Sequence, residues 1–304
     1  PPPEVSAFID AHRADFGVEP ICKVLQVASS AYRLRRRRVL RPDLRSERAR
    51  SDEQALIQIR RVWDESGQLY GVRKVWEQLK RDLVEIPRCR VARLMRTHGL
   101  VGVRRDKGIK TTVQDPKASS PTDLVRRQFH AQRPNQLWVA DFTYVSTWSG
   151  FVFVAFVVDV FARAIVGWKV SYSMRTDFVL DALEQALCAR KPTPEDGLVH
   201  HSDKGVQYLA IRYSIRLVEA GVKASTGTVG DSYDNALAET INGLFKTEVI
   251  RRRSSWRNLE EVEWATMVWV DWFNNRRLFG PLGYRPPSEV EADYFANIGS
   301  TISV

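Results

Sequence analysis

The chain has 304 residues, enough for roughly two or three folding units with buried cores and too many for a disulfide-stapled miniprotein. Hydrophobic residues make up 44 % of it, and 9 Trp, 9 Tyr and 13 Phe exclude intrinsic disorder. Because 46 Lys and Arg outnumber 36 Asp and Glu, the formal net charge is +10. That charge predicts a polyanionic partner, with plain surface charge as the alternative.

The positive charge is confined to the first part of the chain. Residues 1–132 carry 28 basic and 16 acidic side chains, a net charge of +12, which leaves −2 for residues 133–304. Such an asymmetry indicates that one region binds a polyanion while the other does something else.

The cysteines and the apolar runs limit the cellular compartments in which the protein is expected. The 3 cysteines lie far apart, which excludes a disulfide framework and predicts a reducing, cytoplasmic location. The longest apolar run, residues 151–158, ends at Asp159 and is too short to span a bilayer, so no membrane partner is expected. No secretory signal opens the chain. It begins with three prolines and no Met, which predicts a piece of a longer polypeptide.

Residues 1–48 are predicted to form a first helical module. Apolar spacing and helix-ending residues indicate helices at residues 5–16, at residues 19–26, and from residue 29 or 30 through the basic run that ends at Arg38. A short helix, a tight connection and a basic helix resemble a helix-turn-helix unit. Its candidate DNA contacts are Arg35, Arg36 and Arg37. Two surface helices with a solvated charge run are the alternative.

Residues 49–110 are predicted to form a second helix-turn-helix-like module. Helices are expected from Ser51 to the turn at Gly67, at residues 71–83 and at residues 87–97. The third helix and the segment after it are strongly basic, as in elements that enter a DNA groove. The candidate DNA contacts are Arg88, Arg90, Arg93, Arg104 and Arg105. A plain helical spacer is the alternative.

Residues 111–132 lack periodicity and contain several prolines, which indicates a linker to a domain at residues 133–304. In that domain β-branched and aromatic runs predict three consecutive strands. The predicted order is strands at 137–145, 151–158 and 164–171, a helix at 177–189, a strand at 198–200, a helix at 205–220, a strand at 222–225, and helices at 232–249 and 259–275. This order predicts an α/β fold.

Three acids in this domain stand where folding alone would not place them. Asp141 interrupts an apolar strand, where a buried carboxylate costs several kcal/mol unless it has a metal, a donor or solvent. Asp203 directly follows a short strand, where α/β folds place ligands. Glu239 lies on the helix predicted at residues 232–249, and 35 residues separate it from Asp203.

This spacing resembles the Asp, Asp, thirty-five, Glu signature of retroviral-integrase-like transposases, which have a ribonuclease H-like fold. Three segments are similar to the OrfB-type DDE transposases of the third insertion-sequence family, namely residues 200–208, 230–242 and 272–287. Phe279 stands where that family commonly has His. The chain lacks a paired His-His-Cys-Cys zinc set, which makes a transposase a better interpretation than an integrase proper.

The resemblance implies a mixed five-stranded ribonuclease H-like sheet with flanking helices, preceded by all-α helix-turn-helix modules. It further implies an enzyme that nicks 3′ ends at terminal inverted repeats and transfers the strand, with end-to-end joining into a circle as a first step. Asp141, Asp203 and Glu239 would be the catalytic residues and would hold two Mg²⁺, with Mn²⁺ as a substitute. The implied partners are double-stranded inverted-repeat and target DNA, further copies of the chain in a homodimer or higher oligomer, and an upstream DNA-binding polypeptide, separate or fused. The implied location is the bacterial nucleoid.

Neighbours of Glu239 provide further candidates. Asn235, Asn242 and Lys246 stand at −4, +3 and +7 from Glu239 and so share its helix face. By the same resemblance Lys246 would hold a phosphate, with an exposed helix lysine as the alternative, and the two asparagines are candidate DNA contacts.

Other positions are open to two interpretations each. Asp231 and Asp234 are read as helix caps, with metal ligands as the alternative. His200 and His201 either touch DNA or pack. We expect the tryptophans of the last predicted helix to lie in the core and not to stack on DNA bases, namely Trp264, Trp269 and Trp272. The arginines at residues 251–253 either contact flanking DNA or are solvated. The rival functions are a structure-selective nuclease on the same fold and a noncatalytic DNA-binding regulator derived from a transposase.

Overall fold

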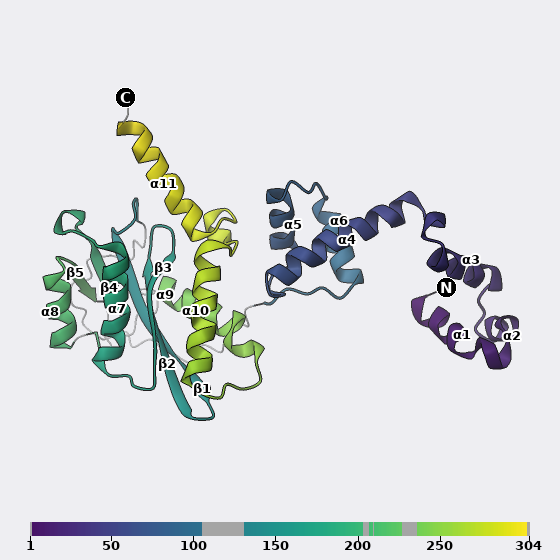
Figure 1. Cartoon of the computed structure of the whole chain (residues 1–304), viewed down its shortest axis with the longest axis horizontal. Coiled ribbons are helices and arrows are strands. Elements are labelled where there is room, and N and C mark those ends of the chain that lie inside the picture. Colours follow the sequence, from purple (N-terminus) through teal and green to yellow (C-terminus); the bar gives the residue numbers. More distant parts are fainter. Residues whose placement is uncertain (1, 105–130, 203–206, 209, 227–235, 303–304) are drawn as a thin grey trace, which may run out of the picture.

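A computed structural model describes residues 2–104, 131–202, 207–208, 210–226 and 236–302. Figure 1 shows two groups of helices, α1–α3 and α4–α6, followed by a region built around a β-sheet. Within the described residues, no helix is long and apolar enough to cross a membrane.

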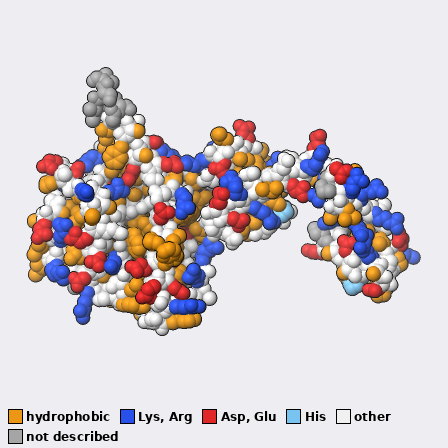
Figure 2. Space-filling view, viewed as in Figure 1, with side chains coloured by type: hydrophobic (Ala, Val, Ile, Leu, Met, Phe, Trp, Pro, Cys, Tyr) orange, Lys and Arg blue, Asp and Glu red, His pale blue; other side chains and the backbone are white. Residues whose placement is uncertain are grey.

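The first group comprises α1 (Pro3–Phe16), α2 (Val18–Val24), α3 (Ser29–Leu40) and the short 3-10 turn η1 (Pro42–Leu44). These bounds confirm the three predicted helices. Their small core consists of Ile9, Ile21, Cys22 and Tyr32. Tyr32 donates its hydroxyl to Asp10 Oδ1 at 2.7 Å, which satisfies the buried phenol. Figure 2 shows Lys and Arg side chains gathered at this end of the molecule.

The second group comprises α4 (Glu47–Glu65), α5 (Val72–Arg81) and α6 (Arg88–Thr97). The predicted start at Ser51 is wrong, because Ser46 caps α4 by accepting the N–H of Ala49 at 3.2 Å. Apolar side chains repeat every three or four residues on all three helices and meet in one core. That core includes Ile59, Val62, Val75, Leu79, Val91, Leu94 and Met95.

The third region contains a five-stranded sheet in the order β3-β2-β1-β4-β5. Its strands are β1 (Leu137–Thr147), β2 (Gly150–Asp159), β3 (Ala164–Ser171), β4 (Val199–Ser202) and β5 (Lys223–Thr226). The first three strands are joined antiparallel, while β4 and β5 run parallel to β1. The predicted mixed five-stranded sheet is confirmed.

Helices cover both faces of this sheet. After β3 come α7 (Thr176–Arg190), η2 (Pro194–Asp196), α8 (Ile211–Glu219), α9 (Ala236–Glu248), η3 (Ile250–Arg252), α10 (Leu259–Asn275), η4 (Gly280–Leu282) and α11 (Pro287–Ile302). The predicted helix start at residue 205 is wrong for the part that is described, because Ala210 is extended and α8 begins after it. Residues 203–206 lie outside the described residues.

Strand periodicity assigns each side chain of β1 to one of two cores. Leu137 and Val139 face α9 and α10, whereas Trp138 and Ala140 face α7 and α8. On the second face β3 approaches α7 closely at Gly167, where a Cβ would stand 2.1 Å from the carbonyl oxygen of Ala182. Alternation then places Asp141 on the α9 side of the central strand.

Candidate active site

Asp141 lies in the middle of β1, the central strand of the sheet, which is hydrogen-bonded to β2 on one side and β4 on the other. Its side chain is half-buried, and both carboxylate oxygens have protein donors. Oδ1 accepts the backbone N–H of Phe142 at 2.8 Å, and Oδ2 accepts Nδ2 of Asn242 at 2.9 Å. These two N–H donors hold the carboxylate in a fixed orientation on the strand.

Helix α9 carries the second acid. Ala238, Ile241 and Phe245 are buried against the sheet and hold one face of the helix in place. Glu239 is exposed in the first turn, and Asn242 follows on the same face three residues later. The hydrogen bond from Asn242 to Asp141 therefore fixes the face of α9 that carries Glu239 at the carboxylate of β1.

Asn242 differs from its prediction as a DNA contact. Its side chain is only 7 % exposed, and its amide nitrogen is engaged with Asp141. Its carbonyl oxygen Oδ1 is buried and has no hydrogen-bond partner among the described residues. Asn242 therefore contacts the carboxylate of Asp141 and does not point into solvent. Its position one helical turn after Glu239 is the feature of the sequence that could have predicted this contact.

Lys246 is half-buried, which contradicts the alternative of an exposed helix lysine. Its Nζ lies 4.9 Å from the ring centroid of Tyr144, the exposed residue three positions beyond Asp141 on β1. Burial lowers the pKa of Lys246, the charge of Arg251 lowers it further, and the charge of Asp141 opposes both. The site therefore pairs carboxylates with one partly desolvated ammonium group.

Strand β4 leads to the third predicted acid. Its last residue, Ser202, pairs with Ala140, the neighbour of Asp141 in sequence. Asp203, Asp231, Asp234 and Asn235 lie outside the described residues. Among the described residues, which do not include Asp203, no three His, Cys, Asp or Glu side chains are grouped as a metal site.

The two histidines of β4 are packed, so the alternative of DNA contact is wrong. Each is 1 % exposed. His200 Nε2 lies 3.1 Å from the hydroxyl of Tyr213, and His201 Nδ1 lies 3.0 Å from Ser225 Oγ. Burial, followed by the neighbouring His201, lowers the pKa of His200 to about 4, so this imidazole is neutral at physiological pH.

The tryptophans of α10 divide between the core and the surface. Trp269 is buried and Trp272 is partly buried, as predicted for core residues. Trp264 is 66 % exposed, so its prediction as a core residue is wrong. It stands on the outer side of α10 together with Met267 and Val268, which are also exposed, whereas the sheet lies against the opposite side.

The predicted DNA contacts on the helical modules lie on basic surfaces that also contain acids. Arg90 Nε donates to Asp52 Oδ1 at 2.7 Å, and Arg93 Nη2 donates to the same carboxylate at 2.7 Å. The hydrogen bond from Arg93 is the main cause that lowers the pKa of Asp52. Arg88, Arg37 and Arg104 are exposed, Arg35 and Arg36 are partly buried on α3, and Arg105 lies outside the described residues.

Sequence reasoning missed one buried ion pair. Arg277 donates to Glu248 at the end of α9, and these side chains are 3 % and 8 % exposed. The only sequence signal is a charged residue on each side of an aromatic-rich helix, which does not identify the partners.

Comparisons with known proteins agree with this architecture. Family models described as Integrase core domain match residues 131–232 and 220–287, and a model described as HTH-like domain matches residues 50–108. The transposase for insertion sequence element IS629 of Shigella sonnei is 57 % identical over 96 % of this chain and 97 % of its own length. The putative transposase for IS986/IS6110 of Mycobacterium tuberculosis is 51 % identical over 83 % of this chain and 91 % of its own length. The HTLV-2 integrase catalytic core domain, solved with magnesium, superposes with a TM-score of 0.43 at 16 % identity and covers 53 % of this chain and 99 % of that one.

The two bacterial relatives align with 96 % and 83 % of this chain, each at more than half identity. The sheet order and the helices on both faces are those of a ribonuclease H-like core. A helix-turn-helix-like region of the DNA-binding type precedes this core. The chain therefore belongs to the OrfB-type DDE transposases of the third insertion-sequence family, which have a retroviral-integrase-like catalytic core.

Proposed function

We propose that this transposase binds the terminal inverted repeats of an insertion sequence, nicks the element at its 3′ ends and joins the freed ends to DNA. The observation that carries the proposal is the hydrogen bond between Asn242 and Asp141, because it brings the Glu239 face of α9 to the acid of β1. We include Asp203 as the third acid because it follows Ser202 in the sequence, and Ser202 pairs with Ala140.

The residues fit a site for hard divalent cations. Such cations prefer oxygen ligands and keep several waters, so a few carboxylates are enough. The bonds that Phe142 and Asn242 donate to Asp141 keep its carboxylate oriented, as donors around a metal-binding carboxylate do. Asp141, Asp203 and Glu239 would hold two Mg²⁺, with Mn²⁺ as a substitute. When bound, the ions activate the attacking water or 3′-hydroxyl and stabilise charge on the leaving oxygen.

The chain's own residues position the substrate around these acids. The partly desolvated ammonium group of Lys246 would bind a phosphate of the DNA end from the same helix face as Glu239. Tyr144, exposed on β1 and in contact with Lys246, limits where that ammonium group can move. Lys246 would therefore hold the DNA backbone at a defined place relative to the acids.

The basic helices would supply most of the DNA affinity. The +12 charge of residues 1–132 suits a phosphate backbone, whereas residues 133–304 carry −2. We place the inverted repeat on α3 and α6, with Arg88 and Arg37 among the contacts. Because two element ends must be joined, the working form would be at least a dimer of this chain on double-stranded DNA.

The experiment is a cleavage and joining assay on a labelled inverted-repeat duplex with Mg²⁺ or Mn²⁺. Asp141→Asn and Glu239→Gln should abolish both products and leave binding of the duplex intact. Glu260→Gln is the matched control, since Glu260 is an exposed acid in the first turn of α10 as Glu239 is in α9. Products that are only trimmed would identify a nuclease, and joining by Glu239→Gln at the wild-type rate would contradict the mechanism.

A further inference from the structure

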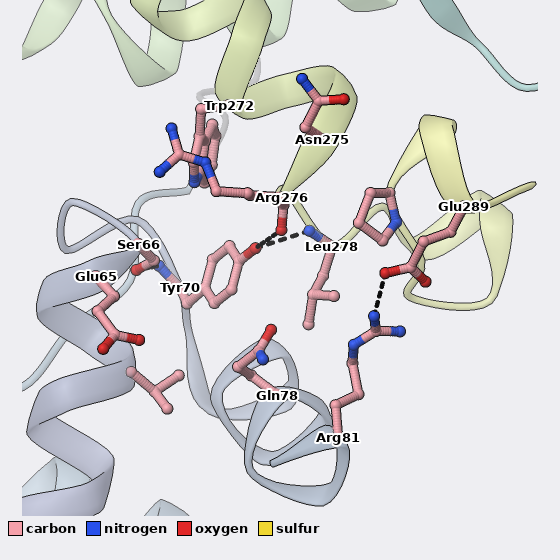
Figure 3. A pocket seen from close by; sticks show the side chains of 12 residues that line it. Glu65, Ser66, Tyr70, Gln78, Arg81, Trp272, Asn275, Arg276, Leu278 and Glu289 are labelled. Carbon is pink, nitrogen blue, oxygen red and sulfur yellow. Dashed lines mark hydrogen bonds and ion pairs between the residues drawn. The ribbon is translucent and has the colours of Figure 1, made fainter. Parts of the chain in front are cut away.

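The hydrophobic core between helices α4–α6 includes a residue from near the C-terminal end of the chain. Leu278, three residues beyond α10, is 0 % exposed and belongs to the hydrophobic core of these helices. Figure 3 shows its side chain directed toward the helix that carries Gln78 and Arg81, with Tyr70 beside it. These residues line a cavity of about 610 Å³. The core of the helix-turn-helix-like region is therefore completed by the catalytic region.

Tyr70 holds the backbone around this leucine. Its hydroxyl group accepts the N–H of Leu278 at 2.7 Å and donates to the carbonyl oxygen of Arg276 at 3.5 Å (Figure 3). Tyr70 is 3 % exposed, and burial raises the pKa of its hydroxyl to about 12, so it remains a donor. One hydroxyl thus satisfies a donor and an acceptor on either side of Arg277.

Arg277 lies between Arg276 and Leu278 in the sequence, and its side chain contacts α9 instead of α4–α6. Its guanidinium group pairs with Glu248, the last residue of α9, and Trp269 donates its indole N–H to the same carboxylate at 3.1 Å. The guanidinium carbon also lies 5.3 Å from the ring centroid of Phe273. Two consecutive residues are therefore buried in two different units, one against α9 and one in the core of α4–α6.

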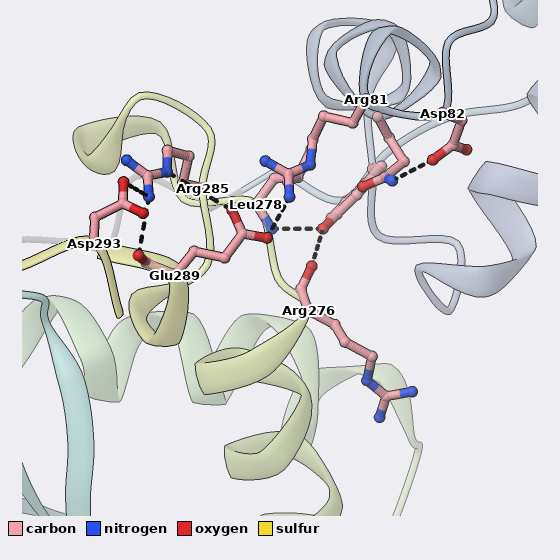
Figure 4. A network of polar contacts seen from close by, with 9 residues as sticks. Arg81, Asp82, Arg276, Leu278, Arg285, Glu289 and Asp293 are labelled. Atoms are coloured by element: carbon pink, nitrogen blue, oxygen red, sulfur yellow. Dashed lines mark hydrogen bonds and ion pairs between the residues drawn. The ribbon is translucent and has the colours of Figure 1, made fainter. Parts of the chain in front are cut away.

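Two polar contacts near Arg277 and Leu278 also join the two units, but they are more exposed to solvent than these two residues. Arg81 of α5 pairs with Glu289 of α11 (Figure 4), and Arg252 donates to the carbonyl oxygen of Gly67. Arg81 and Glu289 are 36 % and 38 % exposed, and ion pairs of that kind contribute little. Arg277 and Leu278 are thus the fully buried part of this junction, beside the partly buried Trp272 and Tyr284, which also pack against the core of α4–α6.

We propose that Arg277 and Leu278 are positioning residues that fix α4–α6 relative to α9, so that DNA held on α6 reaches Glu239 in one orientation. The proposal rests on the proposed function. Helix α9 runs without interruption from Glu239 to Glu248, and Glu248 is joined through Arg277 to Leu278 and so to the core around Tyr70. A disturbance at either end of this link should reach the other.

Hydrogen exchange on the full-length chain without DNA tests the link independently of catalysis. Leu278→Ala, and the milder Tyr70→Phe, should accelerate amide exchange in α4–α6 and also in the last turn of α9. Glu289→Gln, which removes the exposed pairs with Arg81 and Arg285, is the control and should change neither. Acceleration confined to α4–α6 would overturn the proposal, and circular dichroism checks that each variant is folded.

Joining on a labelled inverted-repeat duplex provides the second readout. At saturating DNA, Tyr70→Phe and Leu278→Ala should lower the joining rate by about fivefold or more, the lower end of typical coupling effects, with duplex affinity within about twofold of wild type. Wild-type joining rates in both variants would overturn the link while the proposed function stands. If the wild-type chain itself joins no DNA, the proposed function fails, and coupled exchange between α4–α6 and α9 would still support the link.

Discussion

Removing the guanidinium group of Arg277 should strongly destabilise the protein. Arg277→Met retains an apolar stem but leaves Glu248, 8 % exposed, as a buried carboxylate without its cation. Breaking one partner of a buried ion pair costs about 3–5 kcal/mol. Trp269 still donates to Glu248 in the variant, which partly compensates the charge. We therefore expect a loss near the lower end of that range, about 3 kcal/mol.

The double variant distinguishes an unpaired charge from lost packing. Glu248→Leu with Arg277→Met replaces both ions by apolar groups, and such exchanges are often neutral or stabilising. Its free energy of unfolding should lie within about 1.5 kcal/mol of wild type, the usual cost of volume-conserving core changes. Urea titrations followed by Trp fluorescence measure all three chains, with equal m-values as the check on comparability. A loss below about 1 kcal/mol in Arg277→Met, where a buried unpaired charge should cost more, would refute the reasoning. So would a double variant as unstable as the single one.

Three other substitutions test separate contacts. Asn242→Ala should raise the Mg²⁺ concentration needed for half-maximal joining by about 10–100-fold, because Asp141 loses an orienting donor; an unchanged Mg²⁺ titration would contradict this. Burial lowers the pKa of Lys74 to about 8, so above that pH the unfolded chain binds the extra proton and stability should rise toward pH 10. Lys74→Met should remove this rise in urea titrations at several pH values, and a rise that persists would assign it to other groups. Gly167→Ala should lose about 1–3 kcal/mol of stability, since its Cβ would stand 2.1 Å from the carbonyl oxygen of Ala182; a melting temperature equal to wild type would show that α7 can shift.

Much of the fold follows from local patterns. A run of β-branched and aromatic residues predicted β3 with its observed bounds, and the Trp-rich segment at residues 259–275 predicted α10 correctly. Both signals depend on neighbours a few residues apart, which sequence shows directly. The exposure of Trp264 could not be read this way, because aromatic spacing on a helix does not say which of two apolar sides meets the sheet.

The candidate site was partly predictable for the same reason. Asp141 is conspicuous as a charge within an apolar strand, and Glu239 shares a helix face with Asn242. The junction was not predictable, because Tyr70 and Leu278 are separated by 208 positions and each is typical of an ordinary core residue. Only the packing of one unit on another shows that they meet.

The position of Asp141 on a strand paired from both sides restricts how the gene can change. Its ladder runs antiparallel to β2 on one side and parallel to β4 on the other. Deleting or inserting one codon between Leu137 and Asp141 would turn the carboxylate to the face of α7, because side chains alternate with a period of two. Length changes in this region are therefore tolerable only outside the paired residues of the strand.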